Sequence, residues 1–384
     1  MKFQPQVKAH RPFSHRSSLA NDVVPVRPEL SDRFCERPWE TVEVGTGGVV
    51  TTCCAGWLPT VIGQLPLETV ETIWKSEAIQ EIRATILDGS FRKCRHANCP
   101  FIAAGTLPKR DEITDPFYRD VIDRGLTLCD RGPTFFNLSY DDSCNLTCPS
   151  CRTEYVSVTS GPAYDERARI QARVIDAIYA RSPDERVEVN ITGSGDPFGS
   201  KLFREFLTSI DGAARPNLVF HFMTNGVLFT PSYWRRIQGI RNNIGRVSVS
   251  FDAATAATYA VTRRGGNWEQ LLENMQLLDQ LRGEGVVKKL EAYFVVQGCN
   301  FQEMPDFVRL MDRYPALDWI NFALINNWGT FSREEFDRHA IWRNEHPCYD
   351  AFMSMLRDPV LGSARVFLGN VAPYRARAIE GAAI

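Results

Sequence analysis

The chain has 384 residues, of which 44% are hydrophobic, and a formal net charge of −2 at pH 7. This length allows one large domain with a smaller one beside it. A charge so close to zero argues against a nucleic-acid groove or an anionic membrane surface as the main partner. No run of about 18 apolar residues is present, which excludes a transmembrane helix.

Residues 1–30 are predicted to form a disordered tail. They are basic, rich in serine and arginine, and contain no apolar segment typical of a secretory signal. The chain has 11 cysteines, and cysteines without such a signal favour metal ligation in a reducing compartment over disulfides. We therefore expect a cytoplasmic protein that uses its cysteines for metal binding.

Residues 31–104 begin with a cysteine beside a predicted β-hairpin. Cys35 precedes a strand at 41–44, and a glycine-rich turn leads into a second strand at 49–52. Cys53 follows directly after that strand. Pairing of the two strands would bring the first cysteine close to the one that follows the hairpin.

A second pair of cysteines follows an amphipathic helix predicted at 71–87. Cys94 and Cys99 come after the aspartate-glycine stop of this helix. Two cysteine groups around a helix suit either one four-thiolate iron–sulfur cluster or a structural zinc site. Cys54 is an alternative to its neighbour as a ligand, and Cys129 is an outside candidate.

From residue 134 onward, predicted strands and helices alternate. Apolar runs at 135–140, 187–192, 218–223, 247–251, 290–296 and 319–324 predict strands, with a last short strand at 366–371. Three- and four-residue apolar spacing predicts helices at 166–181, 202–210, 231–240, 268–281 and 304–314. Such alternation predicts a parallel sheet covered by helices, either open or closed. Six strand–helix units rather than eight favour an α/β fold of the partial (β/α)6 TIM-like barrel type.

Three cysteines follow the first of these strands, in the segment Cys144-Asn-Leu-Thr-Cys148-Pro-Ser-Cys151. Three thiolates at one metal centre leave a fourth position open, which is typical of a site that performs chemistry. In parallel α/β folds the chemistry gathers at the carboxyl ends of the strands. A zinc site or a chance group of thiols is the alternative interpretation.

Polar residues and glycines follow the other strands. A glycine allows a close backbone approach, and a carboxylate beside it can accept from an ammonium group. Plain turns, a solvated basic loop and an asparagine helix cap are the alternative interpretations. The candidate cofactor-binding residues are Ser194, Gly195, Asp196, Ser250, Asp252, Arg264 and Asn300.

The C-x3-C-x2-C spacing of Cys144, Cys148 and Cys151 resembles the motif of radical S-adenosylmethionine (radical SAM) enzymes. The resemblance implies that these cysteines hold a [4Fe–4S] cluster whose open iron binds S-adenosylmethionine. It also implies a partial barrel, and contacts to the cofactor from the polar residues at the strand ends. Thr224-Asn225-Gly226 and the Arg264-Gly265-Gly266 segment are similar to turns common in this family.

The N-terminal cysteines resemble the SPASM and twitch domains of the same enzymes. Cys35 and the Gly48-x4-Cys53 spacing match their opening, and Cys94 with Cys99-Pro100 resembles their closing cysteines. The resemblance implies one auxiliary [4Fe–4S] cluster held by these four cysteines. This domain precedes the barrel here, although it normally follows it, so residues 105–133 would be a linker to the barrel at 134–384.

Together, the two resemblances imply an enzyme that cleaves S-adenosylmethionine reductively to a 5′-deoxyadenosyl radical, which abstracts hydrogen from a substrate. We expect a net oxidation or epimerisation of a small polar or sugar-like molecule, with the auxiliary cluster accepting an electron. Modification of a ribosomal peptide is the alternative, and a structural zinc protein is the alternative of another class. A flavodoxin- or ferredoxin-type electron donor is implied, and we expect no nucleic-acid or membrane partner.

Overall fold

A computed structural model describes the chain at residues 30–191 and 194–380. Its strands form one 10-stranded sheet in the order β10-β9-β8-β7-β6-β5-β4-β1-β2-β3. The tail predicted at 1–30 lies outside the described residues except for its last residue.

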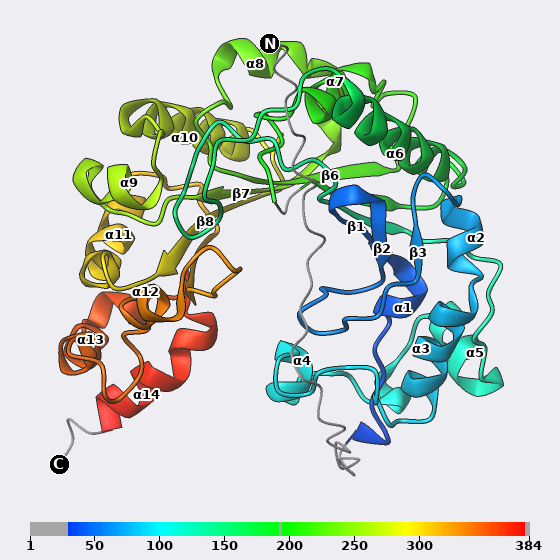
Figure 1. Cartoon of the computed structure of the whole chain (residues 1–384), viewed down its shortest axis with the longest axis horizontal. Helices are drawn as coiled ribbons and strands as arrows, with labels where there is room; N and C mark the ends of the chain where they lie inside the picture. The colour runs from blue at the N-terminus through cyan, green and yellow to red at the C-terminus, as the bar shows by residue number, and fades with distance from the viewer. Residues whose placement is uncertain (1–29, 192–193, 381–384) are drawn as a thin grey trace, which may run out of the picture.

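The middle of the sheet is a curved set of parallel strands. These are β4 (Phe135–Leu138), β5 (Val187–Ile191), β6 (Leu218–Thr224), β7 (Ile244–Ser250), β8 (Lys289–Val296) and β9 (Trp319–Leu324). The helices between them are α6 (Pro162–Tyr179), α7 (Lys201–Ser209), α8 (Pro231–Arg236), α9 (Ala256–Thr262), α10 (Trp268–Gly283) and α11 (Met304–Met311). They lie along the outside of the arch that the sheet forms (Figure 1). The partial (β/α)6 barrel predicted from the sequence is therefore confirmed.

The two faces of the sheet differ in chemistry. The register row Phe136–Val189–Phe220–Ile244 is apolar, and each of these side chains is at most 1% exposed. The neighbouring row points to the opposite face because side chains alternate along a strand. It is polar across five strands: Glu43, Asn137, Asn190, His221 and Arg246. The apolar face packs under the helices, so the polar row lies on the concave side.

The N-terminal region extends the same sheet. Strand β1 (Thr41–Val44) pairs in parallel with β4, while β2 (Val49–Thr51) and β3 (Gly63–Gln64) continue antiparallel. Helices α1 (Arg37–Glu40), α2 (Val70–Trp74), α3 (Glu77–Leu87) and α4 (Pro100–Ala103) complete this region. The single helix predicted at 71–87 is two helices, because Ser76 has an extended backbone with ψ 156°.

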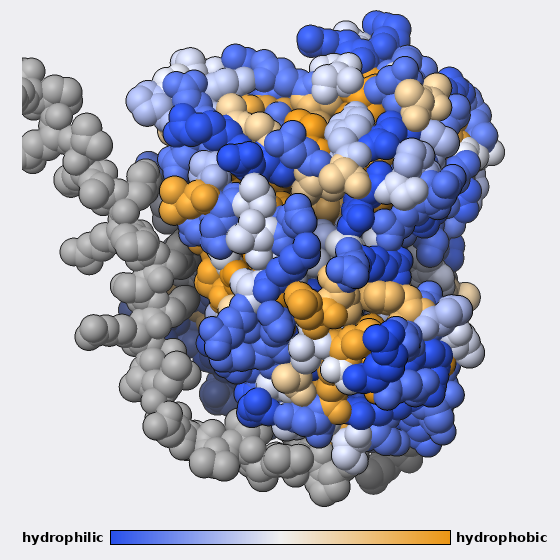
Figure 2. All heavy atoms as spheres, turned by 90° about the vertical axis from the view of Figure 1, so that its right-hand side faces the viewer, coloured by the Kyte–Doolittle hydropathy of each residue, from blue (hydrophilic) through white to orange (hydrophobic). Residues whose placement is uncertain are grey.

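The predicted linker at 105–133 contains helix α5 (Pro116–Arg124), which packs in a second hydrophobic core. That core includes Phe34, Trp39, Phe91, Tyr118 and Val121. The connector therefore folds against the N-terminal region. The outer face on this side of the molecule is mainly hydrophilic, with hydrophobic side chains in several separate places (Figure 2).

The C-terminal region lies at the other end of the arch (Figure 1). Strand β10 (Val366–Phe367) pairs in parallel with β9, and this region also contains α12 (Arg333–Asp337), α13 (Tyr349–Met355) and α14 (Ala372–Glu380). The short 3-10 turns are η2 (Thr46–Gly48), η3 (Arg110–Glu112), η4 (Gln238–Asn243), η5 (Phe301–Glu303), η6 (Pro359–Gly362) and η7 (Gly369–Val371). Within the described ranges, no helix has the length and apolar character needed to cross a bilayer.

Candidate functional site

The three cysteines at 144, 148 and 151 lie on the loop that follows β4, at the carboxyl edge of the parallel strands. Asp141 anchors the start of this loop. Its carboxylate accepts from the Ser143 N–H at 2.9 Å and the Ser200 hydroxyl at 2.7 Å, and it pairs with the guanidinium of Arg167. Since Asp141 is fully buried, these contacts fix where the cysteine loop leaves the sheet.

Each of the three thiols lies beside a nitrogen donor. Asn225 Nδ2 is 3.7 Å from Cys144 Sγ, Arg263 Nη1 is 3.9 Å from Cys148 Sγ, and Arg152 Nη2 is 3.7 Å from Cys151 Sγ. The Leu146 N–H also donates to the first sulfur at 3.4 Å. Donors that face sulfur stabilise thiolate charge and tune iron–sulfur clusters.

Burial makes the thiols of Cys144 and Cys148 weak acids in the absence of metal. It raises the pKa of Cys144 to about 12 and raises the pKa of Cys148 above its usual value. Metal ligands must be deprotonated, so metal binding at such a site releases protons. The bound metal then supplies the positive charge that stabilises the buried thiolates.

Asp196 is a predicted cofactor-binding residue, and both oxygens of its carboxylate accept hydrogen bonds from protein groups. Oδ1 accepts from the backbone N–H of Phe198 at 2.9 Å and of Gly199 at 3.1 Å. Oδ2 accepts from the Thr224 hydroxyl and the Asn225 N–H, both at 2.8 Å. Burial is the largest influence on its pKa and raises it. The carboxylate thereby ties the turn after β5 to the end of β6, where the donor to Cys144 lies.

Gly195 and Ser194, also predicted cofactor residues, contact the cysteine loop itself. A Cβ at Gly195 would lie 2.5 Å from the carbonyl oxygen of Asp141 and 2.6 Å from that of Ser143. Only glycine allows this close backbone approach. The Ser194 hydroxyl donates to the Ser139 carbonyl at 3.1 Å.

Asp252 and Asn300 lie together at the ends of β7 and β8. Asp252 has a left-handed φ of 56°, which is uncommon for a residue with a side chain. Its carboxylate accepts from the Val295 N–H at 2.7 Å and pairs with Arg263 at 2.8 Å. The Asn300 amide donates to the carbonyls of Asp252 and Val295, both at 2.9 Å.

The structure places the buried guanidinium one residue before the predicted Arg264. The side chain of Arg264 is exposed, whereas that of Arg263 is 15% exposed and lies between Asp252 and Cys148. Consecutive side chains at the end of a helix point in different directions. The sequence therefore did not show which of the two consecutive arginines faces inward. Ser250, the remaining predicted contact, lies on the concave face with its hydroxyl 3.7 Å from Met223 Sδ.

The N-terminal cysteines converge on one pocket. Cys35, Cys53, Cys94 and Cys99 all line it, and Leu58, Phe91 and Phe101 contribute to its apolar wall. Cys54 is absent from this lining, which favours its neighbour as the ligand. Burial raises the pKa of Cys35 to about 11 and that of Cys53 to about 12. In residues 30–191 and 194–380, no three His, Cys, Asp or Glu side chains are grouped tightly enough for a single metal ion.

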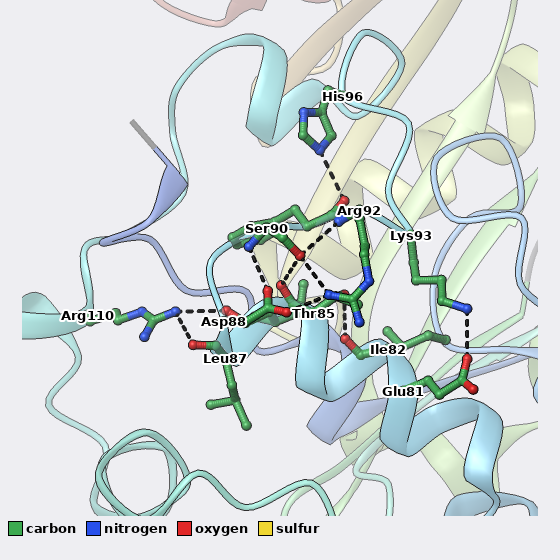
Figure 3. A network of polar contacts seen from close by, with 12 residues as sticks. Glu81, Ile82, Thr85, Leu87, Asp88, Ser90, Arg92, Lys93, His96 and Arg110 are labelled. Atoms are coloured by element: carbon green, nitrogen blue, oxygen red, sulfur yellow. Dashed lines mark hydrogen bonds and ion pairs between the residues drawn. The ribbon is translucent and has the colours of Figure 1, made fainter. Parts of the chain in front are cut away.

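A polar network holds the turn that carries Cys94 (Figure 3). The Asp88 carboxylate accepts from the Ser90 N–H at 2.8 Å and pairs with Arg92. The His96 ring contacts the Phe91 carbonyl at 3.1 Å. Two residues outside the turn add further contacts: Arg110 donates to the Ile86 and Leu87 carbonyls at 2.9 and 2.7 Å, and Glu81 pairs with Lys93 at 2.7 Å.

Phe91 within this turn has a left-handed φ of 48°. It and Asp252 are the non-glycine residues of the described ranges with positive φ. One lies at each cysteine site. Backbone strain of this kind concentrates at functional sites, where the surrounding contacts maintain it.

Two family models match the chain. Residues 139–318 match the radical SAM superfamily, and residues 35–100 match an iron–sulfur cluster-binding domain, SPASM. The chain therefore carries a radical SAM domain, and a SPASM domain precedes it. These domains bind a [4Fe–4S] cluster with S-adenosylmethionine and an auxiliary iron–sulfur cluster.

Solved structures with partial likeness include native anSMEcpe with bound AdoMet, at 16% identity and a TM-score of 0.44. The match covers 60% of this chain and 62% of that one. Another is the radical S-adenosylmethionine methyltransferase TsrM from Kitasatospora setae, at 14% identity and a TM-score of 0.33, covering 47% of this chain and 32% of that one. No curated protein matches the chain.

Proposed function

We propose that this chain is a radical SAM enzyme that abstracts hydrogen from a small, polar, sugar-like substrate in a net oxidation or epimerisation. The observation that carries the proposal is the set of three thiols, each beside a nitrogen donor, at the carboxyl edge of the parallel strands. When bound there by Cys144, Cys148 and Cys151, a [4Fe–4S] cluster supplies the reductive cleavage of S-adenosylmethionine and hence the radical chemistry. A flavodoxin- or ferredoxin-type protein is the proposed electron donor.

The residues around the cysteine loop divide into three groups with different proposed roles. Asp196 and Asn300 position the backbone at the strand ends, because their side chains form hydrogen bonds with protein groups. Arg263, Asn225 and Arg152 stabilise thiolate charge. Ser194, Gly195, Ser250, Asp252 and Arg264 remain predicted cofactor contacts.

We assign the second cluster to Cys35, Cys53, Cys94 and Cys99. Their shared pocket supports this assignment. With all four positions filled by cysteine, a cluster bound there supplies one-electron transfer rather than an open iron for substrate.

The concave face of the sheet supports a polar substrate. A TIM barrel is normally filled by bulky branched side chains, whereas this face carries a row of amides and charged groups. Its asparagines bond to each other, with Asn190 Nδ2 donating to Asn137 Oδ1 at 2.8 Å. Such a lining provides hydrogen bonds that a polyhydroxylated molecule can satisfy.

The charge of this face favours a neutral or cationic substrate over a phosphorylated one. Glu188 bonds to His221 at 2.8 Å, and this hydrogen bond lowers the pKa of the carboxyl to about 2, so it stays ionised. Glu291 accepts from Ser248 at 3.0 Å and lies 3.9 Å from Arg246. Arg186 pairs with Glu188 at 2.9 Å. With Glu43 there are three acidic side chains against these two guanidinium groups, and this excess disfavours anionic ligands.

The first experiment is metal and sulfide analysis after anaerobic reconstitution. We expect about eight irons per chain, little zinc, and 5′-deoxyadenosine when reductant and S-adenosylmethionine are added. The matched control replaces Cys144, Cys148 and Cys151 with alanine, which should leave about four irons and no 5′-deoxyadenosine. Stoichiometric zinc with little iron would overturn the proposal.

The substrate class is tested by which compounds increase 5′-deoxyadenosine formation. We expect neutral polyols, sugars or amino sugars to stimulate it more than sugar phosphates or unstructured peptides. Glu291→Gln should weaken the discrimination against phosphates, whereas Glu334→Gln, on the exposed helix α12, should not. Stimulation by peptides alone would favour peptide modification instead.

A further inference from the structure

An arginine in the N-terminal cysteine pocket is held in place by two aromatic rings. Arg37 lines the pocket together with the cysteines, Trp57 and Phe101. The carbon of its guanidinium group is 5.8 Å from the Trp57 ring centroid and 5.5 Å from the Phe101 centroid. The two rings themselves pack edge to face, with centroids 6.1 Å apart. Arginine favours such stacking because its charge is planar and weakly hydrated.

The positive charge of Arg37 has no carboxylate partner at ion-pair distance among the described residues. Glu43 is close enough for Arg37 to lower its pKa, against the larger raising effect of burial, but the two do not form an ion pair. Charges placed in apolar surroundings are normally paired. The groups that share the pocket with this guanidinium are the four thiols.

Arg37 follows Cys35 by two residues and lines the same pocket as all four thiols. Its guanidinium group is therefore a fixed positive charge at the site proposed for the cluster.

We propose that Arg37 is the built-in counter-charge of the auxiliary cluster and raises its reduction potential. This inference rests on the proposed ligation by Cys35, Cys53, Cys94 and Cys99. The potential of a cluster depends on its net charge, on hydrogen bonds to its sulfurs and on solvent exposure. A fixed cation beside four thiolates stabilises the reduced form, which carries one more negative charge, more than the oxidised form. Arg37 is thus a positioning and tuning residue, not a catalytic one.

The two aromatic rings explain why an arginine, and not a lysine, occupies this position. An unstacked side chain would turn toward water, where dissolved salt screens its charge over about 8 Å. Stacking between Trp57 and Phe101 keeps the guanidinium in the pocket wall. The charge is therefore present before a cluster binds, so no side chain has to reorganise on reduction.

The test is an anaerobic redox titration of the full chain, followed by electron paramagnetic resonance, with the two clusters read separately. Arg37→Gln should shift the potential of the auxiliary cluster to more negative values, while the potential of the barrel cluster stays unchanged. Arg37→Lys, which keeps the charge, should give a smaller shift. Arg95→Gln is the matched control, because Arg95 is adjacent to Cys94 in sequence but exposed, and it should leave both potentials unchanged.

The outcomes separate this inference from the assignment of the ligands. If the wild-type protein shows only one cluster signal, the proposed ligation by the four cysteines has failed, and this inference fails with it. If both signals are present and Arg37→Gln leaves the auxiliary potential unchanged, only the role of Arg37 is overturned. If Arg37→Gln loses the auxiliary cluster, Arg37→Lys decides between two explanations. A cluster retained in Arg37→Lys supports the need for a cation. A cluster lost in both variants shows that Arg37 has a packing role alone, which overturns the inference.

Discussion

Arg263 forms an ion pair with Asp252, with Nη2 2.8 Å from Oδ2, and its Nη1 lies 3.9 Å from the sulfur of Cys148. The aspartate is 1% exposed and has a left-handed backbone. One guanidinium therefore joins the end of β7 to the cysteine loop that follows β4. These two segments are more than 100 residues apart in sequence, so this pair locks the edge of the sheet where the proposed cluster binds.

Removing one member of this pair should destabilise the protein more than removing both. Asp252→Asn leaves the buried guanidinium without its partner, and breaking such a pair costs roughly 3–5 kcal/mol. Asparagine tolerates the left-handed backbone, so the variant isolates the charge. Urea unfolding of reconstituted protein measures the loss, and Asp252→Asn with Arg263→Met should recover part of it. A loss below about 1 kcal/mol in the single variant would mean that the pair is solvated.

Gly195→Ala should remove the barrel cluster and spare the auxiliary one. The added Cβ would meet two backbone oxygens of the cysteine loop, those of Asp141 and Ser143, and backbone cannot move aside as a flexible side chain can. Iron should fall from about eight to about four per chain. Gly283→Ala, whose Cβ meets nothing within 4 Å, should keep all of it. Equal iron in both variants would contradict the close approach.

Cys53→Ala and Cys54→Ala should differ sharply although the two cysteines are neighbours. The first removes a thiol that lines the N-terminal pocket, whereas the second removes one that does not. We expect about four irons for Cys53→Ala and about eight for Cys54→Ala. Alkylation offers a second readout, since a thiol bound to iron is protected until a chelator removes the metal. The reverse pattern would exchange the ligand assignment of the two cysteines.

Asp196→Asn should weaken S-adenosylmethionine binding through the position of Asn225. The amide that replaces the carboxylate has one acceptor oxygen, so the donors at one of the two oxygen positions lose their acceptor: either the Phe198 and Gly199 N–H groups or the Thr224 hydroxyl and the Asn225 N–H. Either loss loosens the tie between the turn after β5 and the end of β6. Leaving a buried donor unsatisfied costs about 1–3 kcal/mol, and about 1.4 kcal/mol corresponds to a tenfold change in affinity. Equilibrium dialysis against reconstituted protein measures this. The control is Asp211→Asn, whose carboxylate accepts from the Ala213 and Ala214 N–H groups in an exposed turn. Equal affinity in both variants would show that Asp196 does not act on the site.

Much of the fold was predictable because its signals are local. Apolar runs separated by amphipathic stretches marked each of the strands from β4 to β9, and the observed bounds differ by a few residues at most. Helix α9 was missed, since its short sequence from Ala256 to Thr262 carries little periodicity. The break at Ser76 was missed for a similar reason, because the apolar spacing continues across it while the backbone does not.

Cysteine spacing by itself determined the superfamily, since ligands within a few residues of each other converge whatever the remaining chain does. The tertiary structure decided what long-range packing controls: that β1 pairs with β4, so that both cysteine sites are built on one sheet. It also decided that Arg263 turns inward and Arg264 does not, and that Asp196 forms hydrogen bonds to the backbone at the end of β6. It further decided that Arg37 is stacked on aromatic rings beside four thiols. Side-chain direction depends on neighbours that are distant in sequence, and no local pattern encodes it.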